Sequence, residues 1–229
     1  MVDNFLERDV KLAIIIDVNE ELGLKAIESM STKYGSDKVV FLKCDVSTNL
    51  DETFNIVISK YKFVDILVNN AGISNEKTLK SVIDINLISL MEWSVKFYDY
   101  MRQDRGGHGG TIINVASVYG LEITPFAPIY HASKSGVIGF TKSLGHGYNF
   151  KKSGVRVVAL CPGFTYTQMT ANTVLRDDDM LEDFMKLAKS SEWQQVDAVG
   201  KGVIEIVEKA ESGTIWIVQG SRSAVMVKK

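Results

Sequence analysis

The chain has 229 residues, of which 45% are hydrophobic and 24% are charged, and its formal net charge is −2. This ordinary globular mixture suits one α/β domain, which we predict over 1–229. The sequence has no basic block of the kind that binds nucleic acid or an acidic membrane surface, and its apolar runs are too short for a transmembrane helix. Cys44 and Cys161 lie in apolar stretches without metal-ligand spacing, which favours reduced core thiols in a cytoplasmic protein.

Strand-like and helix-like segments alternate along the chain. Val2–Arg8 has the pattern of the end of an amphipathic helix, and helical spacing returns around Leu24–Tyr34 and Leu50–Tyr61. This alternation predicts a doubly wound parallel sheet with right-handed crossovers, a Rossmann-type α/β fold. The less regular stretch 167–195 has room for a substrate lid. The predicted strands, which are β-branched and nearly continuous in apolar character, are Leu12–Ile16, Val39–Leu42, Val64–Val68, Thr111–Val115, Val155–Leu160 and Thr214–Val218.

The start of the chain departs from the usual order of such a fold. A doubly wound domain normally opens with a strand, a glycine-rich turn and a helix. Here no strand or glycine-rich turn precedes Val2–Arg8, and no G-x-G-x-x-G spacing occurs. The cluster Gly106–Gly110 precedes a strand, whereas a phosphate loop follows a strand and opens a helix, so we predict a surface turn there. The expected fold therefore lacks the first strand and the cofactor loop, and leaves Leu12–Ile16 and Val64–Val68 without a shared neighbour.

Tyr130 and Lys134 carry the most informative spacing. They stand one helical turn apart on one face of a predicted helix. A free tyrosine titrates near pH ~10, and an adjacent ammonium favours its phenolate, which would make Tyr130 a general acid or base. Ser117, which follows the strand Thr111–Val115, could hold a substrate oxygen beside the phenol. Taken alone, the Tyr-x-x-x-Lys spacing is more typical of a surface pair on a helix.

Several ordered motifs place these residues in a wider pattern. These motifs are Asn69-Asn70-Ala71-Gly72 after a strand, Asn86 in a helix, Asn114–Ser117, Tyr130 with Lys134, and Pro162-Gly163 followed by Thr167. With them, the sequence from Val2 to Val218 resembles the short-chain dehydrogenase/reductase family. The runs Gly110–Gly120, Ile138-Gly139-Phe140 and Gly213–Val218 look most like insect alcohol dehydrogenases and hydroxyprostaglandin dehydrogenase-like members.

The resemblance implies a role for each matching catalytic position. Tyr130 would be the general acid/base, and Lys134 would lower its pKa and bind the nicotinamide ribose. Ser117 would orient the substrate oxygen, and Asn86 would complete a proton relay to the lysine. His131 is expected to be a bystander, because neighbouring helix residues point about a hundred degrees apart.

The resemblance also implies a nicotinamide cofactor. Pro162, Gly163 and Thr167 would hold the carboxamide. Asp17 ends a strand, and a carboxylate there would accept hydrogen bonds from the ribose hydroxyls and repel a 2′-phosphate, which favours NAD over NADP. Alternatively, Asp17 is the N-terminal cap of a helix that begins near Glu20. The positions expected near the adenosine are Asp45, Val46, Asn69, Ala71 and Gly72.

The predicted activity is NAD-dependent interconversion of a secondary alcohol and a ketone. Apolar residues such as Phe126, Ile129 and Phe164 suggest an aliphatic or lipid-like substrate, although ordinary helix packing would also explain them. By resemblance, the helix that contains Tyr130, expected over 130–150, and the long helix before it, expected over 78–101, would form the interface of a homodimer or homotetramer. The alternative function is that of a truncated, non-catalytic member that binds a ligand or partner. No nucleic-acid, membrane or metal site is predicted.

Overall fold

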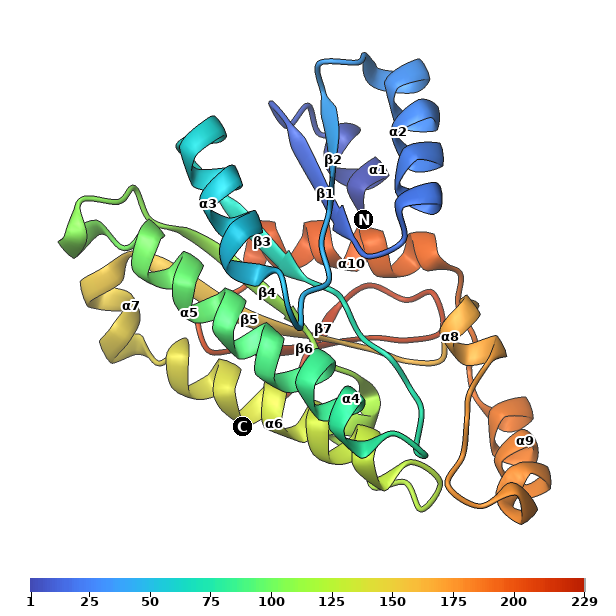
Figure 1. Cartoon of the computed structure of the whole chain (residues 1–229). Helices are drawn as coiled ribbons and strands as arrows, with labels where there is room; N and C mark the ends of the chain where they lie inside the picture. Colours follow the sequence, from blue (N-terminus) through green and yellow to red (C-terminus); the bar gives the residue numbers. More distant parts are fainter. Residues whose placement is uncertain (229) are drawn as a thin grey trace. The chain divides into compact units, whose positions relative to one another are not determined.

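The computed structural model describes residues Met1–Lys228, and the chain forms two compact units, Met1–Lys62 and a second that begins at Phe63. Each unit has its own sheet. The elements of both follow the predicted α/β alternation (Figure 1). The single domain over 1–229 stays a prediction.

The first unit is a parallel βαβ arrangement flanked by two further helices. Its elements are α1 Val2–Leu6, β1 Ala13–Asp17, α2 Glu20–Tyr34, β2 Val39–Lys43 and α3 Leu50–Tyr61. In the sheet, Ala13 lies opposite Val39 and Asp17 opposite Lys43. The side chain of Asn19 accepts a hydrogen bond from the backbone N–H of Leu22 and so caps α2. The predicted strands and helices of this region are confirmed, although several of their ends differ by a few residues.

The second unit contains a five-stranded sheet in the order β3-β4-β5-β6-β7. The first four strands are parallel, as their β-branched apolar runs predict, and β7 is antiparallel to β6. β7 is short and exposed, and the sequence analysis did not predict it. The strands are β3 Ile66–Asn69, β4 Gly110–Val115, β5 Val155–Pro162, β6 Ile215–Val218 and β7 Val225–Met226.

The predicted loss of a shared neighbour matches the strand pairing. β1 and β3 belong to different sheets, and within the described residues each pairs with one strand, β1 with β2 and β3 with β4. One long edge of each strand thus carries no strand partner in the described part of the chain. The Gly106–Gly110 cluster connects η2, Gln103–Arg105, to β4 and forms a turn, as predicted.

The helical hairpin of the second unit differs in two details from the predicted helices. The region 78–101 consists of α4 Leu79–Ile83, a π-helical turn η1 Asp84–Ile88 and α5 Ser89–Met101. The predicted continuous helix over 130–150 is wrong after Leu144, where α6, Pro128–Leu144, ends and α7, Gly147–Ser153, begins. The break falls where Gly145 approaches the next segment so closely that a Cβ on it would lie 2.5 Å from the Val157 carbonyl oxygen.

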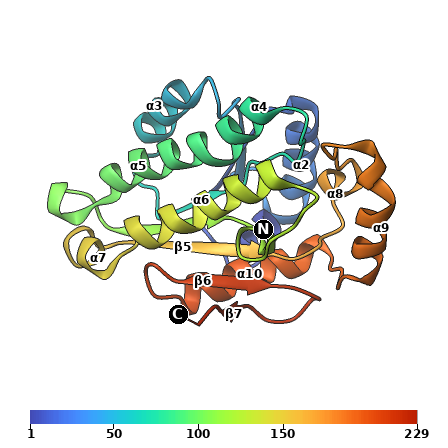
Figure 2. The same ribbon diagram turned by 90° about the horizontal axis from the view of Figure 1, so that it is seen from below.

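The remaining elements of this unit follow β4 and β5 in the chain. They are η3 Val118–Gly120, α8 Gln168–Ala171, η4 Asp178–Met180, α9 Leu181–Ser190 and α10 Val196–Lys209. Helices α5 and α6 cover one face of the sheet and α10 covers the other (Figure 2). Within the described residues, no helix combines the length and the apolarity that a bilayer-spanning segment needs.

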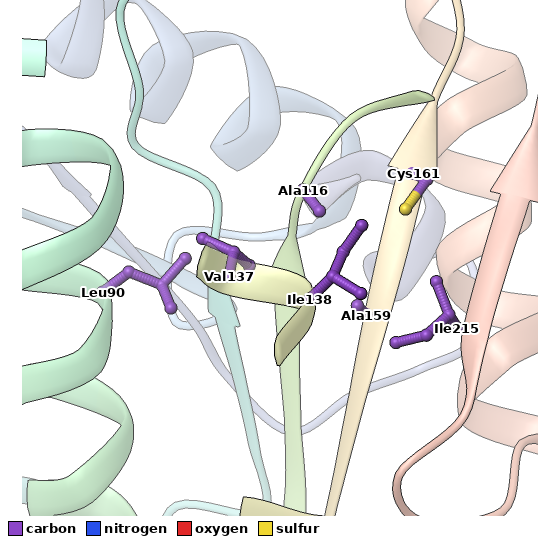
Figure 3. Close-up of a cluster of buried hydrophobic side chains, with 7 residues drawn as sticks. All are labelled: Leu90, Ala116, Val137, Ile138, Ala159, Cys161 and Ile215. Carbon is purple, nitrogen blue, oxygen red and sulfur yellow. The ribbon is translucent and has the colours of Figure 1, made fainter. Parts of the chain in front are cut away.

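The core of the second unit lies between the sheet and the pair α5–α6. Val137 and Ile138 of α6 pack with Leu90 of α5 against side chains of β5 and β6 and of the residue that follows β4 (Figure 3). Cys161 of β5 belongs to this cluster, and both cysteines are buried free thiols, as predicted. This packing fixes the face of α6 that continues into the site described next. The cluster consists of Leu90, Ala116, Val137, Ile138, Ala159, Cys161 and Ile215.

Candidate active site

Ser117 and Tyr130 meet at the carboxyl end of β4. Ser117 follows that strand with an extended backbone, and its Oγ accepts a hydrogen bond from the Tyr119 N–H over 3.1 Å. Tyr130 is the third residue of α6, and its phenol lies beside the Ser117 side chain. Burial raises the pKa of Tyr130 to about 12, and the neighbouring Ser117 hydroxyl opposes this rise. The structure therefore brings together the predicted hydroxyl pair and keeps the phenol protonated.

Lys134 lies one turn further along α6 and is only 3% exposed. Its Nζ donates a hydrogen bond to the Val115 carbonyl oxygen over 2.8 Å and lies 5.6 Å from the centroid of the Tyr130 ring. Burial lowers the pKa of Lys134 to about 8. The predicted lowering of the tyrosine pKa by the lysine is wrong for this structure, because burial disfavours both charges and raises the phenol pKa.

Asn86 occupies the π-helical turn η1 and is 0% exposed. Its Oδ1 accepts from the Ile73 N–H over 2.8 Å, and its Nδ2 donates to the Ile73 carbonyl over 2.9 Å and to Ser133 Oγ over 3.3 Å. The amide thus fixes the turn that follows β3. A Cβ on Gly72 would lie 3.3 Å from Asn86 Oδ1 and 3.6 Å from Lys134 Nζ, so this glycine leaves room beside both groups.

The side chain of Asn69 makes hydrogen bonds within the fold. Its Nδ2 donates to Ser94 Oγ and to Asn114 Oδ1, both over 2.9 Å, and Asn114 in turn donates to Thr141 Oγ1 over 3.0 Å. This network joins β3, α5, β4 and α6 below the site. The side chain of Asn69 therefore holds neighbouring elements together. Gly72, three residues further on, lies beside Lys134.

Pro162 is the last residue of β5, and Gly163 and Thr167 follow it. The Gly163 N–H donates to the Val218 carbonyl over 2.8 Å, and a Cβ on Gly163 would lie 2.7 Å from Gln219 Cγ, so a larger residue would force that side chain to shift. Thr167 is exposed and caps α8, since its Oγ1 accepts from the Thr170 N–H over 3.3 Å. Cys161, which directly precedes Pro162 in β5, is buried, and burial raises the pKa of its thiol to about 12.

The first unit holds the other predicted cofactor positions. Asp17 is exposed at the end of β1, and its Oδ1 accepts from the Asn19 N–H over 2.8 Å. Because Asn19 caps α2, the alternative interpretation of Asp17 as that cap is wrong. Asp45 Oδ1 accepts from the N–H and the hydroxyl of Ser47, which lower its pKa, and Val46 beside it is half-buried.

Aromatic side chains gather around the segment after β5. The ring centroids of Phe126 and Phe184 lie 5.8 Å apart, and those of Phe164 and Trp193 lie 5.1 Å apart. Phe164 also contacts Tyr119, two residues beyond Ser117, at 5.8 Å. Helix α9, which supplies Phe184, has no buried residue. The arrangement joins apolar rings to the neighbourhood of Ser117, and the lid within 167–195 stays a prediction.

Two neighbouring residues contact the backbone around the site. His131 Nδ1 lies 2.5 Å from the Tyr119 carbonyl oxygen, so its ring is engaged with the backbone, which fits the predicted bystander. Glu76 is 4% exposed and binds the backbone N–H groups of Ile129 and Tyr130. The sequence analysis missed Glu76; the available signal is that Ala127-Pro128 offers no capping side chain at the start of α6.

Comparison with known proteins gives a consistent result for most of the chain. The family model described as short chain dehydrogenase matches residues 1–178. The chain is 34% identical over 217 residues to 15-hydroxyprostaglandin dehydrogenase [NAD(+)] of Rattus norvegicus, in a match that covers 91% of this chain and 81% of that protein. It is 33% identical over 216 residues to alcohol dehydrogenase 1 of Ceratitis cosyra, covering 93% of this chain and 83% of the relative.

A solved structure extends the comparison to the fold. A single-substitution variant of actinorhodin polyketide ketoreductase, solved with NADPH, matches with a TM-score of 0.78 at 22% identity, over 96% of this chain and 90% of that one. At this identity the likeness concerns the fold alone.

Proposed function

The chain belongs to the short-chain dehydrogenase family, and on that premise we propose that it is an NAD-dependent oxidoreductase that interconverts a secondary alcohol and a ketone. One observation carries the proposal: the Tyr130 phenol lies beside the Ser117 side chain and one helical turn from a buried Lys134. A tyrosine–lysine pair on a helix surface would leave the ammonium in water, because burying a charge costs free energy.

The side chains divide the proton chemistry between them. In the reducing direction the protonated Tyr130 gives its phenolic proton to the carbonyl oxygen that Ser117 holds, and in the oxidising direction its phenolate takes the alcohol proton. The raised pKa of Tyr130 means that this site favours the acid form, which suits ketone reduction. A bound nicotinamide would supply or accept the hydride.

The residues present fit such a cofactor in each unit. In the second unit, Gly72 leaves space beside Lys134 Nζ and Asn86 Oδ1, where a larger residue would fill the approach. Lys134 would bind ribose hydroxyls there, and Pro162, Gly163 and Thr167 would lie at the carboxamide. In the first unit, the exposed carboxylate of Asp17 at the end of β1 supports NAD over NADP, since it would repel a 2′-phosphate. Asp45, Val46 and Ala71 keep their proposed places near the adenosine.

We further propose an apolar, aliphatic or lipid-like substrate. The support is the aromatic contact of Phe126 with Phe184 and of Phe164 with Tyr119, which places rings next to the serine that orients the substrate oxygen. We also propose a homodimer or homotetramer through residues 78–101 and 130–150. The two buried free thiols support a cytoplasmic location.

The test is steady-state oxidation of a series of aliphatic secondary alcohols of increasing chain length by the purified chain, with NAD and with NADP. We expect turnover with NAD, a higher kcat/KM for longer chains, and a loss of kcat on the order of 10²–10⁴ in Tyr130→Phe. The matched control is Tyr148→Phe, which removes the hydroxyl of an exposed tyrosine on α7 and should leave kcat unchanged. Turnover that survives in Tyr130→Phe, or a preference for NADP, would contradict the proposal.

A further inference from the structure

The helix that carries Tyr130 begins without a cap of its own. Ala127 occupies the N-cap position of α6 and has no side-chain acceptor, and Pro128 has no backbone N–H. The His131 N–H donates to the Ala127 carbonyl over 2.8 Å. The N–H groups of Ile129 and Tyr130 are therefore the two donors of the first turn that need an acceptor from elsewhere.

Glu76 supplies both acceptors from the loop after β3. Its Oε2 accepts from the Ile129 N–H over 2.9 Å and its Oε1 accepts from the Tyr130 N–H over 2.8 Å. The carboxylate is 4% exposed, so water competes little for these bonds. A carboxylate at a helix N-terminus also meets the positive end of the helix dipole, which stabilises it there. Glu76 thus holds Tyr130 through the backbone N–H of that residue.

The loop of Glu76 is itself fixed at both ends. At one end Asn86 binds the N–H and the carbonyl of Ile73. At the other the Glu76 N–H donates to the Val174 carbonyl over 2.9 Å, and Asn75 forms a parallel bridge with Val174. The loop that carries the carboxylate is therefore held by hydrogen bonds to Asn86 on one side and to the segment after α8 on the other.

We propose that Glu76 is a positioning residue for the reaction: by binding the first turn of α6 it sets the place of the Tyr130 phenol relative to Ser117. This inference rests on the proposed function. Glu76 reaches the reacting atoms only through the backbone of Tyr130, so it moves no proton in the reaction. Since Tyr130 is the third residue of α6, fraying of the first turn displaces its ring directly. Misplacement of a catalytic group by about 1 Å can cost on the order of 10² in rate.

The experiment compares Glu76→Ala and Glu76→Gln with the wild-type chain. We expect Glu76→Ala to lower kcat on the order of tenfold to a hundredfold while KM for NAD changes less than about threefold. Glu76→Gln keeps one acceptor oxygen and should recover part of that loss. The acidic limb of the kcat profile for alcohol oxidation should move to higher pH in Glu76→Ala, because a displaced phenol no longer lies beside the Ser117 hydroxyl that lowers its pKa.

Two controls separate positioning from a loss of stability. Asp197→Asn removes an exposed carboxylate from the first turn of α10, a helix without a proposed site residue, and should keep kcat and the pH profile. Ile206→Val trims a buried core residue of α10 and serves as a destabilised variant with an intact site. If Ile206→Val lost as much kcat as Glu76→Ala at a similar drop in Tm, the effect would be one of stability and the proposal would be overturned.

Amide hydrogen exchange of the peptide that contains Ile129 and Tyr130 gives a readout that needs no turnover. We expect faster exchange of this peptide in Glu76→Ala and unchanged exchange in Asp197→Asn. Unchanged exchange in Glu76→Ala, or an acidic limb that moves to lower pH as simple removal of a negative charge would cause, overturns the proposal. If the wild-type chain itself shows no turnover, the proposed function is overturned and the positioning role with it, whereas normal wild-type turnover with an unaffected Glu76→Ala overturns only the role of Glu76.

Discussion

Asn69→Ala is expected to destabilise the second unit rather than to remove a ligand contact. Its Nδ2 makes two hydrogen bonds inside the fold, to Ser94 Oγ and to Asn114 Oδ1, each 2.9 Å long. A typical intramolecular hydrogen bond contributes a net ~1 kcal/mol to stability. Ser94 Oγ still donates to Asn114 Oδ1 over 3.1 Å after the change, so the buried oxygen of Asn114 keeps a donor. We therefore expect a loss of about 2–3 kcal/mol in the free energy of unfolding.

The matched control is Asn70→Ala, the same change at the exposed next position. Surface substitutions of this kind usually stay within about 0.5 kcal/mol. Urea unfolding followed by tryptophan fluorescence is the assay, because the three tryptophans, Trp93, Trp193 and Trp216, all lie in the second unit. The midpoint should fall in Asn69→Ala alone, with the slope unchanged.

The same pair of variants separates a structural role of Asn69 from a binding role. Without denaturant, the Kd for NAD of Asn69→Ala should stay within about threefold of wild type, since a lost direct hydrogen bond of ~1 kcal/mol or more would change it about fivefold or more. Equal unfolding free energies for Asn69→Ala and Asn70→Ala, or a large loss of NAD affinity without a loss of stability, would refute the reasoning.

Two further predictions concern α6. Burial lowers the pKa of Lys134 from 10.5 to about 8, so between these values the unfolded chain binds a proton that the folded chain does not. The free energy of unfolding should then rise by about 3 kcal/mol as the pH increases across this window, and this rise should be absent in Lys134→Met. Urea unfolding at several pH values measures both, and the same pH dependence in the two chains would contradict the prediction. In Gly120→Ala the new Cβ would lie 2.8 Å from the Lys134 carbonyl oxygen, which should cost about 1–3 kcal/mol and lower kcat, whereas Gly139→Ala, with nothing within 4 Å, should raise Tm and keep kcat. Thermal unfolding and initial rates of the two glycine variants check this, and equal effects would count against it.

The parallel strands could be predicted because each is a β-branched apolar run. The structure buries β4 and β5 almost throughout and leaves most residues of β1, β2, β3 and β6 half-buried. β7 could not be predicted, because Val225–Met226 is a two-residue exposed edge whose pairing with β6 depends on the return of the chain. The end of α6 was missed for a similar reason. Gly145 ends the helix through its contact with Val157 of β5, a tertiary approach that helical periodicity does not contain.

The sequence could predict which residues form the site, but not how deeply each is buried or which groups surround it. Spacing and motif order brought Ser117, Tyr130 and Lys134 together correctly, yet the direction of the tyrosine pKa shift was wrong, since spacing carries no measure of burial. Glu76 shows the same limit. The missing cap at Ala127 indicates that an acceptor is needed, but the sequence does not say which distant carboxylate the fold delivers.

The buried polar groups of the site share one arrangement, since each makes a hydrogen bond to the backbone of a neighbouring segment. Asn86 binds Ile73, Glu76 binds the first turn of α6, and Lys134 binds the Val115 carbonyl. An ammonium has three donors, and the Val115 bond uses one of them. Ribose hydroxyls that accepted the other donors would favour the charged lysine and raise its pKa again, because hydrogen bonding to the charged form offsets desolvation. A charged Lys134 would then lower the pKa of Tyr130, so the effect predicted from the Tyr-x-x-x-Lys spacing should depend on occupation of the site and not on the helix alone.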